Sequence, residues 1–153
     1  MNNVIEIKQI DRGTINYLVR NLDDFGKDKA IKKGLGDAGK VFEKGGKGRL
    51  KRSMKSGSRG VTGNLLRSFN VRVKKSKPGV LVGFKQGKDG GSHAHLVDMG
   101  TTDRYWKTKS HKYVGKVKAN HFWTDTEEQD YPKALETLYD GIERAVNRIN
   151  NRQ

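Results

Sequence analysis

Apolar residues near the C-terminal end of the chain recur at alternating steps of three and four. They are Tyr131, Leu135, Leu138, Ile142, Ala145 and Ile149. This spacing places them on one face of an α-helix, and such a helix is stable only when another element covers that face. Asp130 suits the N-cap and Pro132 the first turn. We therefore expect this helix to begin at Asp130, after a separate turn or short helix over 122–129.

Two apolar stripes of the same kind lie near the N-terminus. The first comprises Ile15, Leu18, Val19, Leu22 and Phe25, and the second Ala30, Ile31, Leu35, Ala38, Val41 and Phe42. Asp11 and Thr14 are suited to cap the first helix, and Gly26 to end it. Gly34, Gly36 and Gly39 weaken the second helix by about 1 kcal/mol each relative to Ala, but small residues also permit close contact with another helix.

Strands are indicated in two places. Phe69, Val71 and Val73 alternate with polar residues, and Val80, Val82 and Phe84 alternate in the same way after a turn over 76–79. This pattern predicts a β-hairpin. Residues 4–8 favour a further strand or an extended arm. The fold class expected is α+β, with a small antiparallel sheet packed against an N-terminal helix pair and a long C-terminal helix.

The rest of the chain favours loops. Between Glu43 and Gly60, Leu50 and Met54 are the only large apolar residues. A segment this polar buries too little surface to fold by itself, so we expect a mobile basic loop over about 43–62, with an optional short helix from Gly48 to Met54. Its basic residues are Lys44, Lys47, Arg49, Lys51, Arg52, Lys55 and Arg59. We expect residues 86–92 to form a polar loop and residues 93–102 to form a short helix or a strand. We expect a further long loop over about 101–119.

Charge is distributed unevenly along the chain. The 153 residues, which suit one domain over 1–153, carry a net charge of +15, and residues 27–78 alone contribute +14 whereas residues 122–153 contribute −3. This asymmetry favours a polyanion or an acidic protein as partner, although a solvated charged face would give the same pattern. The chain has no cysteine, which excludes disulfides and thiolate metal sites. We expect no signal peptide and no membrane span.

Catalytic and ligand motifs are weak. Gly34 to Val41 resembles a phosphate-binding loop, but Val41 replaces the hydroxyl residue and no buried strand precedes it, so a glycine-rich helix is favoured. His93 and His95 lack a third convergent ligand. No nucleophile motif occurs. We therefore expect no catalytic, cofactor or metal site. We expect Asp98, an acid in an apolar run, to accept backbone or lysine hydrogen bonds beside Gly100.

Three short motifs carry a family resemblance. They are Thr62-Gly63-Asn64-Leu65-Leu66-Arg67-Ser68, then Leu96-Val97-Asp98-Met99-Gly100-Thr101, then Ala119-Asn120-His121-Phe122 before the last helix. In order and spacing the chain resembles the phage tail-component family typified by gene product 10 of phage HK97. It departs from that pattern at Met99, where an aromatic residue is usual, and before Phe122, where a proline is usual. The residues that carry the resemblance are Thr62, Gly63, Leu65, Ser68, Asp98, Gly100, Thr101 and Phe122.

The resemblance implies a non-enzymatic structural protein of the virion. Such a protein would be made in the bacterial cytoplasm and form a homo-oligomeric ring at the head–tail interface. Its partners would be neck, connector, tail-tube or tail-terminator proteins, with non-specific contact to packaged DNA. The charged segments 27–78 and 122–153 would suit complementary patches between subunits.

Two other classes stay open on the sequence alone: a basic module that contacts nucleic-acid phosphates non-specifically, and an enzyme or toxin with an unrecognised site. The first lacks the usual sequence signatures of nucleic-acid-binding folds. Portal, capsid and tail-tube genes beside this gene would favour the virion protein.

At the backbone level, we expect Gly63 and Gly100 to need positive φ or a close backbone approach.

Overall fold

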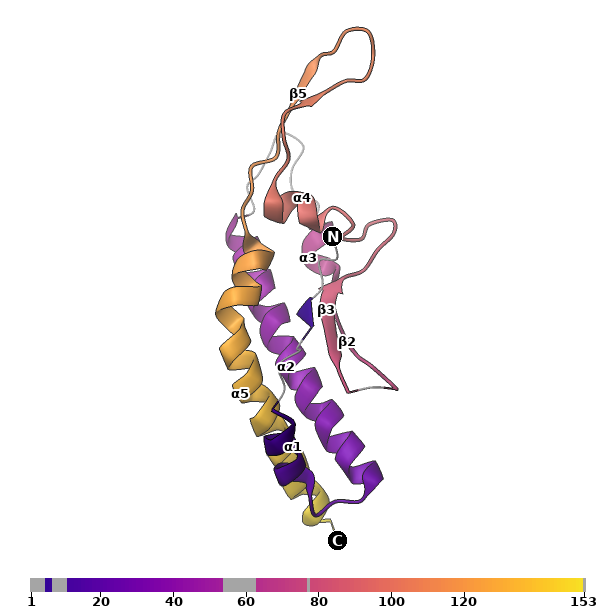
Figure 1. Ribbon diagram of the computed structural model, residues 1–153. Coiled ribbons are helices and arrows are strands. Elements are labelled where there is room, and N and C mark those ends of the chain that lie inside the picture. Colours follow the sequence, from indigo (N-terminus) through magenta and orange to yellow (C-terminus); the bar gives the residue numbers. More distant parts are fainter. Residues whose placement is uncertain (1–4, 7–10, 54–62, 77, 153) are drawn as a thin grey trace.

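A long central helix separates a small antiparallel sheet from a second long helix (Figure 1). The computed structural model describes residues 5–6, 11–53, 63–76 and 78–152. The elements are β1 (Ile5–Glu6), α1 (Arg12–Val19), α2 (Asp24–Ser53), α3 (Asn64–Arg67), β2 (Phe69–Val73), β3 (Val80–Phe84), α4 (Ala94–Met99), β4 (Arg104–Tyr105), β5 (Tyr113–Gly115) and α5 (Phe122–Asn150). The predicted α+β fold, with an N-terminal helix pair and a long C-terminal helix, is confirmed.

The first two helices divide earlier than the apolar stripe suggested. Asp11 caps α1 as expected, accepting hydrogen bonds from the backbone N–H groups of Gly13 and Thr14. The Thr14 hydroxyl also donates to Asp11, and this bond is the main reason that the pKa of Asp11 lies below its ordinary value. The expected end at Gly26 is wrong: α1 stops at Val19, and the Asp23 carboxylate accepts from the N–H of Gly26 at 2.7 Å inside the next helix. Phe25 therefore lies in the first turn of α2 and is 77% exposed.

Helix α2 continues through the segment predicted to be a mobile loop. Residues 43–53 are helical, so the loop expected over about 43–62 is wrong for that part, and residues 54–62 lie outside the described residues. The polar composition of this segment predicted a loop, but packing against other elements stabilises the helix. Phe42 and Leu50 are buried, and Gly46 lies so close to the Phe69 ring that a Cβ there would be 2.8 Å from it.

The C-terminal helix starts eight residues before its expected cap. Helix α5 begins at Phe122 and contains Pro132 in its interior, so the predicted break and the Asp130 cap are both wrong. Asp130 instead uses its carboxylate to bind Arg49 of α2. The proline is tolerated because α5 is held along its length against α2, from Phe122 and Trp123 to Ala145.

The predicted hairpin is confirmed. β2 and β3 are antiparallel with Phe69 opposite Phe84, Val71 opposite Val82 and Val73 opposite Val80, and β1 pairs with the other edge of β3. The sheet lies on α2, where Gly39 permits the approach: a Cβ there would be 2.6 Å from Val71 and 2.9 Å from Val80.

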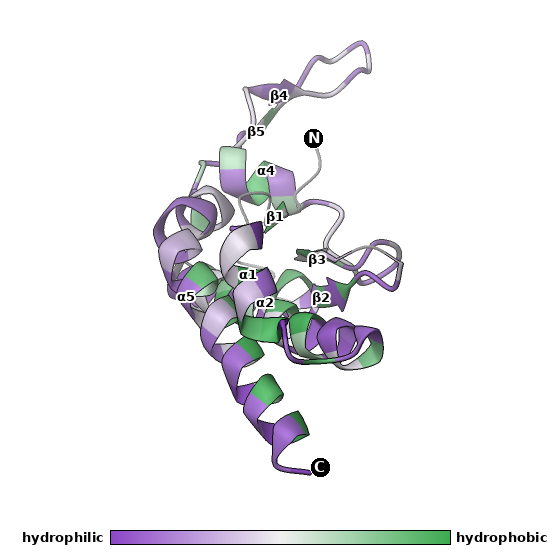
Figure 2. Cartoon of the chain, turned by 60° about the horizontal axis from the view of Figure 1, so that its bottom comes forward, coloured by the Kyte–Doolittle hydropathy of each residue, from purple (hydrophilic) through white to green (hydrophobic). Residues whose placement is uncertain are grey.

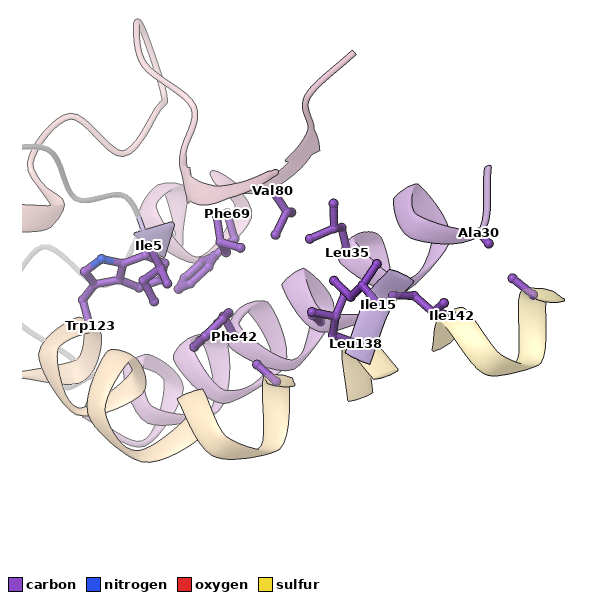
Figure 3. Packing of buried hydrophobic residues seen from close by; sticks show 14 of the residues in the cluster. Ile5, Ile15, Ala30, Leu35, Phe42, Phe69, Val80, Trp123, Leu138 and Ile142 are labelled. Carbon is purple, nitrogen blue, oxygen red and sulfur yellow. The ribbon is translucent and has the colours of Figure 1, made fainter. Parts of the chain in front are cut away.

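The core lies on both faces of α2. Figure 3 shows Leu35 and Phe42 of α2 between Val80 and Phe69 of the sheet and Leu138 and Ile142 of α5. Figure 2 shows hydrophobic residues recurring at intervals along the otherwise hydrophilic C-terminal turns of α5. At the end near α4, an aromatic cluster joins sheet and helix, and it consists of Phe69, Phe84, Phe122 and Trp123.

Residues 101–119 contain a two-stranded ribbon where a long loop was expected. β4 and β5 pair antiparallel, and the segment projects beyond α4, away from the rest of the molecule (Figure 1). We call residues 104–115 the arm. The open question over 93–102 resolves as a short helix, α4, followed by an extended segment.

Candidate functional site

Four of the eight residues that carry the family resemblance lie where α4 contacts the start of α5: Asp98, Gly100, Thr101 and Phe122. Asp98 is 3% exposed, and its carboxylate accepts hydrogen bonds from the backbone N–H groups of Trp123 at 2.8 Å and Thr124 at 3.1 Å. The Thr124 hydroxyl donates to it at 2.7 Å. The first N–H groups of a helix have no partner within the helix, so Asp98 supplies their acceptor from another element. The expected role of Asp98 as an acceptor of backbone hydrogen bonds is confirmed.

Backbone hydrogen bonds complete this connection, which we call the α4–α5 joint (residues 96–101 and 117–124). Asn120 and His121 donate their N–H groups to the carbonyls of Val97 and Asp98, at 3.2 and 3.0 Å. Thr101 donates its N–H to the Val117 carbonyl and accepts the Val117 N–H on its hydroxyl, both at 2.9 Å. Val97, Asp98 and Thr101 of the Leu96–Thr101 motif therefore all form hydrogen bonds across the joint.

Gly100 meets both conditions expected of it. Its φ is 76° and its ψ is −176°, a region occupied almost only by glycine. A Cβ there would be 2.7 Å from the backbone nitrogen of Ala119 and 2.8 Å from the carbonyl oxygen of Val117. Gly100 thus lets the two segments of the joint, residues 96–101 and 117–124, approach each other closely.

The Thr-Gly-x-Leu-x-x-Ser motif forms a second structural connection. Gly63 has φ 74° and precedes α3, as expected, and Thr62 lies outside the described residues. Leu65 is buried, and the buried Ser68 hydroxyl donates to the Leu65 carbonyl at 2.7 Å. Ser68 contacts the chain just before α4, since a Cβ on Gly91 would be 2.3 Å from the Ser68 hydroxyl oxygen. Both motifs therefore organise the same end of the molecule.

The basic residues predicted to share a mobile loop are separated by the structure. Lys44, Lys47, Arg49, Lys51 and Arg52 lie on α2, and Lys55 and Arg59 fall outside the described residues. Lys47 pairs with Glu43 at 2.6 Å and lies over the Phe69 ring. Arg49 is largely buried, with two hydrogen bonds to Asp130, at 2.7 and 3.2 Å, and one to Thr126, at 3.1 Å. The hydrogen bond to Asp130 is the main cause that raises the pKa of Arg49 above its ordinary value.

A basic surface runs along one side of the contact between α2 and α5, and we call it the basic seam. Three hollows follow one another there, with Lys33, Asp37, Lys40, Ala145 and Arg148 shared between neighbours. The largest has a volume of about 490 Å³. The basic side chains that line them are Lys29, Lys33, Lys40, Lys44, Arg49, Arg52, Lys133, Arg144, Arg148 and Arg152.

The sequence did not predict the part of the basic seam that comes from the C-terminal segment, which supplies four of its ten basic side chains. Residues 122–153 sum to −3, which predicts an acidic segment that could complement residues 27–78. The structure instead places the α5 cations beside those of α2 within the same chain. The detectable signal was helical spacing: Lys133, Arg144 and Arg148 lie within about 60° of one another at 100° per residue, although Asp140 lies only about 20° from Lys133.

The arm presents aromatic residues to solvent. Tyr105, Trp106 and Tyr113 are each more than half exposed, and the rings of Tyr105 and Tyr113 are 5.4 Å apart. None of the buried core residues comes from 104–115. In the described ranges, no three His, Asp or Glu side chains form a group that could hold a metal ion. No helix in the same ranges is long and apolar enough to cross a membrane.

No protein-family model matches this chain, and no curated protein or solved structure matches it significantly.

Proposed function

We propose that this protein is a structural component of the neck or upper tail of a tailed bacteriophage. It would assemble into a homo-oligomeric ring at the head–tail interface, contact connector and tail-tube or tail-terminator proteins, and help join the tail to the capsid around the DNA channel. In this role it performs no catalysis and needs no cofactor.

The arm is the observation that carries this proposal. An isolated two-stranded ribbon is marginal in water, and exposed aromatic clusters mark interaction surfaces. Tyr105, Trp106 and Tyr113 are 55%, 54% and 51% exposed at the end of a projection that contributes nothing to the core. A closed ring needs two different complementary patches on each subunit, and an arm that reaches a neighbour supplies one of them.

The family motifs support the proposal through their position. Gly100, Thr101 and Val117 form the base from which the arm leaves, and Asp98 fixes that base to α5. The motifs that resemble the phage family thus determine how the arm is held, rather than forming a reactive site.

The test uses purified virions of the phage that encodes the protein, together with an arm variant. We expect mass spectrometry to detect the protein in virions, and portal, capsid and tail-tube genes to neighbour its gene. Trp106→Ser/Tyr113→Ser should fold normally but fail to restore infectivity to a deletion phage. Tyr17→Ser/Phe25→Ser alters exposed aromatics of α1 and the start of α2, at the end of the molecule opposite the arm (Figure 1). It is the matched control and should restore infectivity. Absence of the wild-type protein from virions would refute the proposal.

The alternative is a basic module that contacts nucleic-acid phosphates non-specifically, and the basic seam is the observation that favours it. Under this alternative the protein would be absent from virions, and the arm variant would behave like its control.

A further inference from the structure

We infer that the basic seam binds the sugar-phosphate backbone of duplex DNA. The inference deepens the nucleic-acid alternative and is independent of ring assembly, so it can fail or succeed separately. The site consists of two rows of cations. Lys29, Lys33, Lys40, Lys44 and Arg52 come from α2, and Lys133, Arg144, Arg148 and Arg152 come from α5.

The charge of the seam is almost entirely positive. Ten basic and two acidic side chains line it, a net of +8. Both acids are already paired: Asp37 with Lys33 at 2.8 Å, and Asp130 with Arg49 at 2.7 Å. The other eight cations form no ion pair with any carboxylate in the described part of the chain. Such a concentration of one sign attracts a polyanion strongly.

The two rows are held together by unusually close helix packing. A Cβ on Gly34 would be 2.6 Å from the Leu138 carbonyl oxygen, and one on Gly141 would be 3.0 Å from the Cα of Gly34. A Cβ on Gly45 would overlap the Asp130 carboxylate that binds Arg49. These glycines permit the close spacing of the two helices, so the backbone positions that carry the two rows of cations are set before any ligand arrives.

The dimensions favour a duplex backbone. From Lys29 to Arg52 the α2 row spans about 35 Å at 1.5 Å per residue, close to one turn of duplex DNA at about 34–36 Å. Two packed helices are about 20 Å wide, which exceeds the major groove of about 12 Å. The seam therefore cannot enter the groove to reach base edges, and binding must be sequence-independent.

An acidic protein is the competing partner, and the lining argues against it. Protein interfaces have an apolar core surrounded by a polar rim. The seam offers Val41, Ala145 and Ile149 as its larger apolar lining residues, dispersed among the cations. Phosphates need only the cations, and arginine binds them in a two-pronged geometry.

The test compares two variants of the full chain with equal charge. The seam variant is Lys40→Gln/Lys44→Gln/Arg144→Gln/Arg148→Gln. The control is Lys85→Gln/Lys88→Gln/Lys109→Gln/Lys112→Gln, which changes exposed lysines outside the seam. Each lowers the net charge by four, from +15 to +11. Anisotropy of labelled duplexes of about one to three helical turns, of two unrelated sequences, is measured between about 50 and 200 mM salt. Circular dichroism checks that both variants fold.

We expect the wild type to bind both sequences equally. The seam variant should reduce the slope of log K against log salt by about 3 to 4, at roughly 0.9 per lost phosphate contact, and should bind at least about tenfold more weakly than the control. Equal weakening by both variants would show a bulk-charge effect and overturn the inference. So would no binding by the wild type at the lowest salt, or a seam-dependent preference for polyglutamate over DNA.

Discussion

At the scale of single residues, Asp98 accepts hydrogen bonds from the first N–H groups of α5, a role that the N-cap residue of a helix usually fills. The N-cap of α5 is His121, which has φ 54° and makes no capping hydrogen bond with its side chain. Asp98, 23 positions before His121, accepts the N–H groups of Trp123 and Thr124 instead. The start of α5 is thus capped from two sources: Asn120 accepts the N–H of Phe122, and Asp98 of α4 accepts the next two.

Asp98→Ala should destabilise the fold by about 2–4 kcal/mol, because it removes a cap and leaves buried donors without an acceptor. Asp98→Asn keeps one acceptor oxygen and should lose about 1 kcal/mol. Asp103→Ala, at an exposed site, is the control and should change stability by less than about 0.5 kcal/mol. Urea unfolding measures all three. Equal stability of the Ala variant and the control would contradict the capping role.

Gly100→Ala tests the close approach in the α4–α5 joint. Gly100 combines positive φ with backbone atoms 2.7 and 2.8 Å from the position of a Cβ, whereas Gly115 has φ 91° and open space around that position. Gly115→Ala should cost about 1 kcal/mol for backbone strain alone. Gly100→Ala should cost at least about 2–3 kcal/mol, since strain and clash combine, and Gly100→Val should cost no less. Similar melting temperatures for the two alanine variants would show that the joint can widen freely.

At the scale of elements, α5 tolerates a proline that its local sequence cannot favour. An interior proline lacks the N–H that would bond to the carbonyl four residues earlier, here Glu128, and is about 3 kcal/mol worse than Ala. Packing against α2 compensates, through the buried side chains of Leu138 and Ile142 and the Arg49–Asp130 pair. Helix α2 shows the same effect: its glycine-rich second half is stabilised by packing, since Phe42 and Leu50 are buried and Gly39 and Gly46 permit close contact with the sheet.

Pro132→Ala should stabilise the protein by about 2 kcal/mol. The gain of about 3 kcal/mol in helix stability is offset by up to about 1 kcal/mol, because proline also restricts the unfolded chain. The melting temperature should rise by about 4–8 °C for a chain of this size. Glu136→Ala, another exposed position of α5, should have little effect. A lower melting temperature for Pro132→Ala would mean that the proline is required for the packing of α5.

At the scale of the whole molecule, the fold divides into a packed body and a projecting arm. The body contains the core on both faces of α2, while the arm contains exposed aromatics and none of the core residues. The α4–α5 joint connects them. This division separates what keeps the protein folded from what is available to partners.

Replacing residues 105–114 by Asn-Gly tests that division. Arg104 and Gly115 are paired across the ribbon, and Asn-Gly is favoured in two-residue hairpin turns. We expect an unchanged cooperative unfolding transition, with a melting temperature within a few degrees of wild type, because no core residue is removed. Incorporation into virions should be lost. A large fall in melting temperature would show that the arm stabilises the body.

Periodicity alone determined the main elements of this protein. The steps of three and four in residues 131–149 and the alternation around Phe69 and Val80 gave the long last helix and the hairpin, since these patterns reflect the geometry of one element against water. Local context, rather than periodicity, identified Gly63, Gly100 and Asp98 as special backbone or acceptor positions. Only the tertiary structure decided that residues 43–53 are helical, that α5 passes through Pro132, and that cations of α2 and α5 share one seam. The physical reason is the same in each case. The stabilising contacts come from residues far away in the sequence, so they cannot be predicted from local helix propensity or from the net charge of a segment.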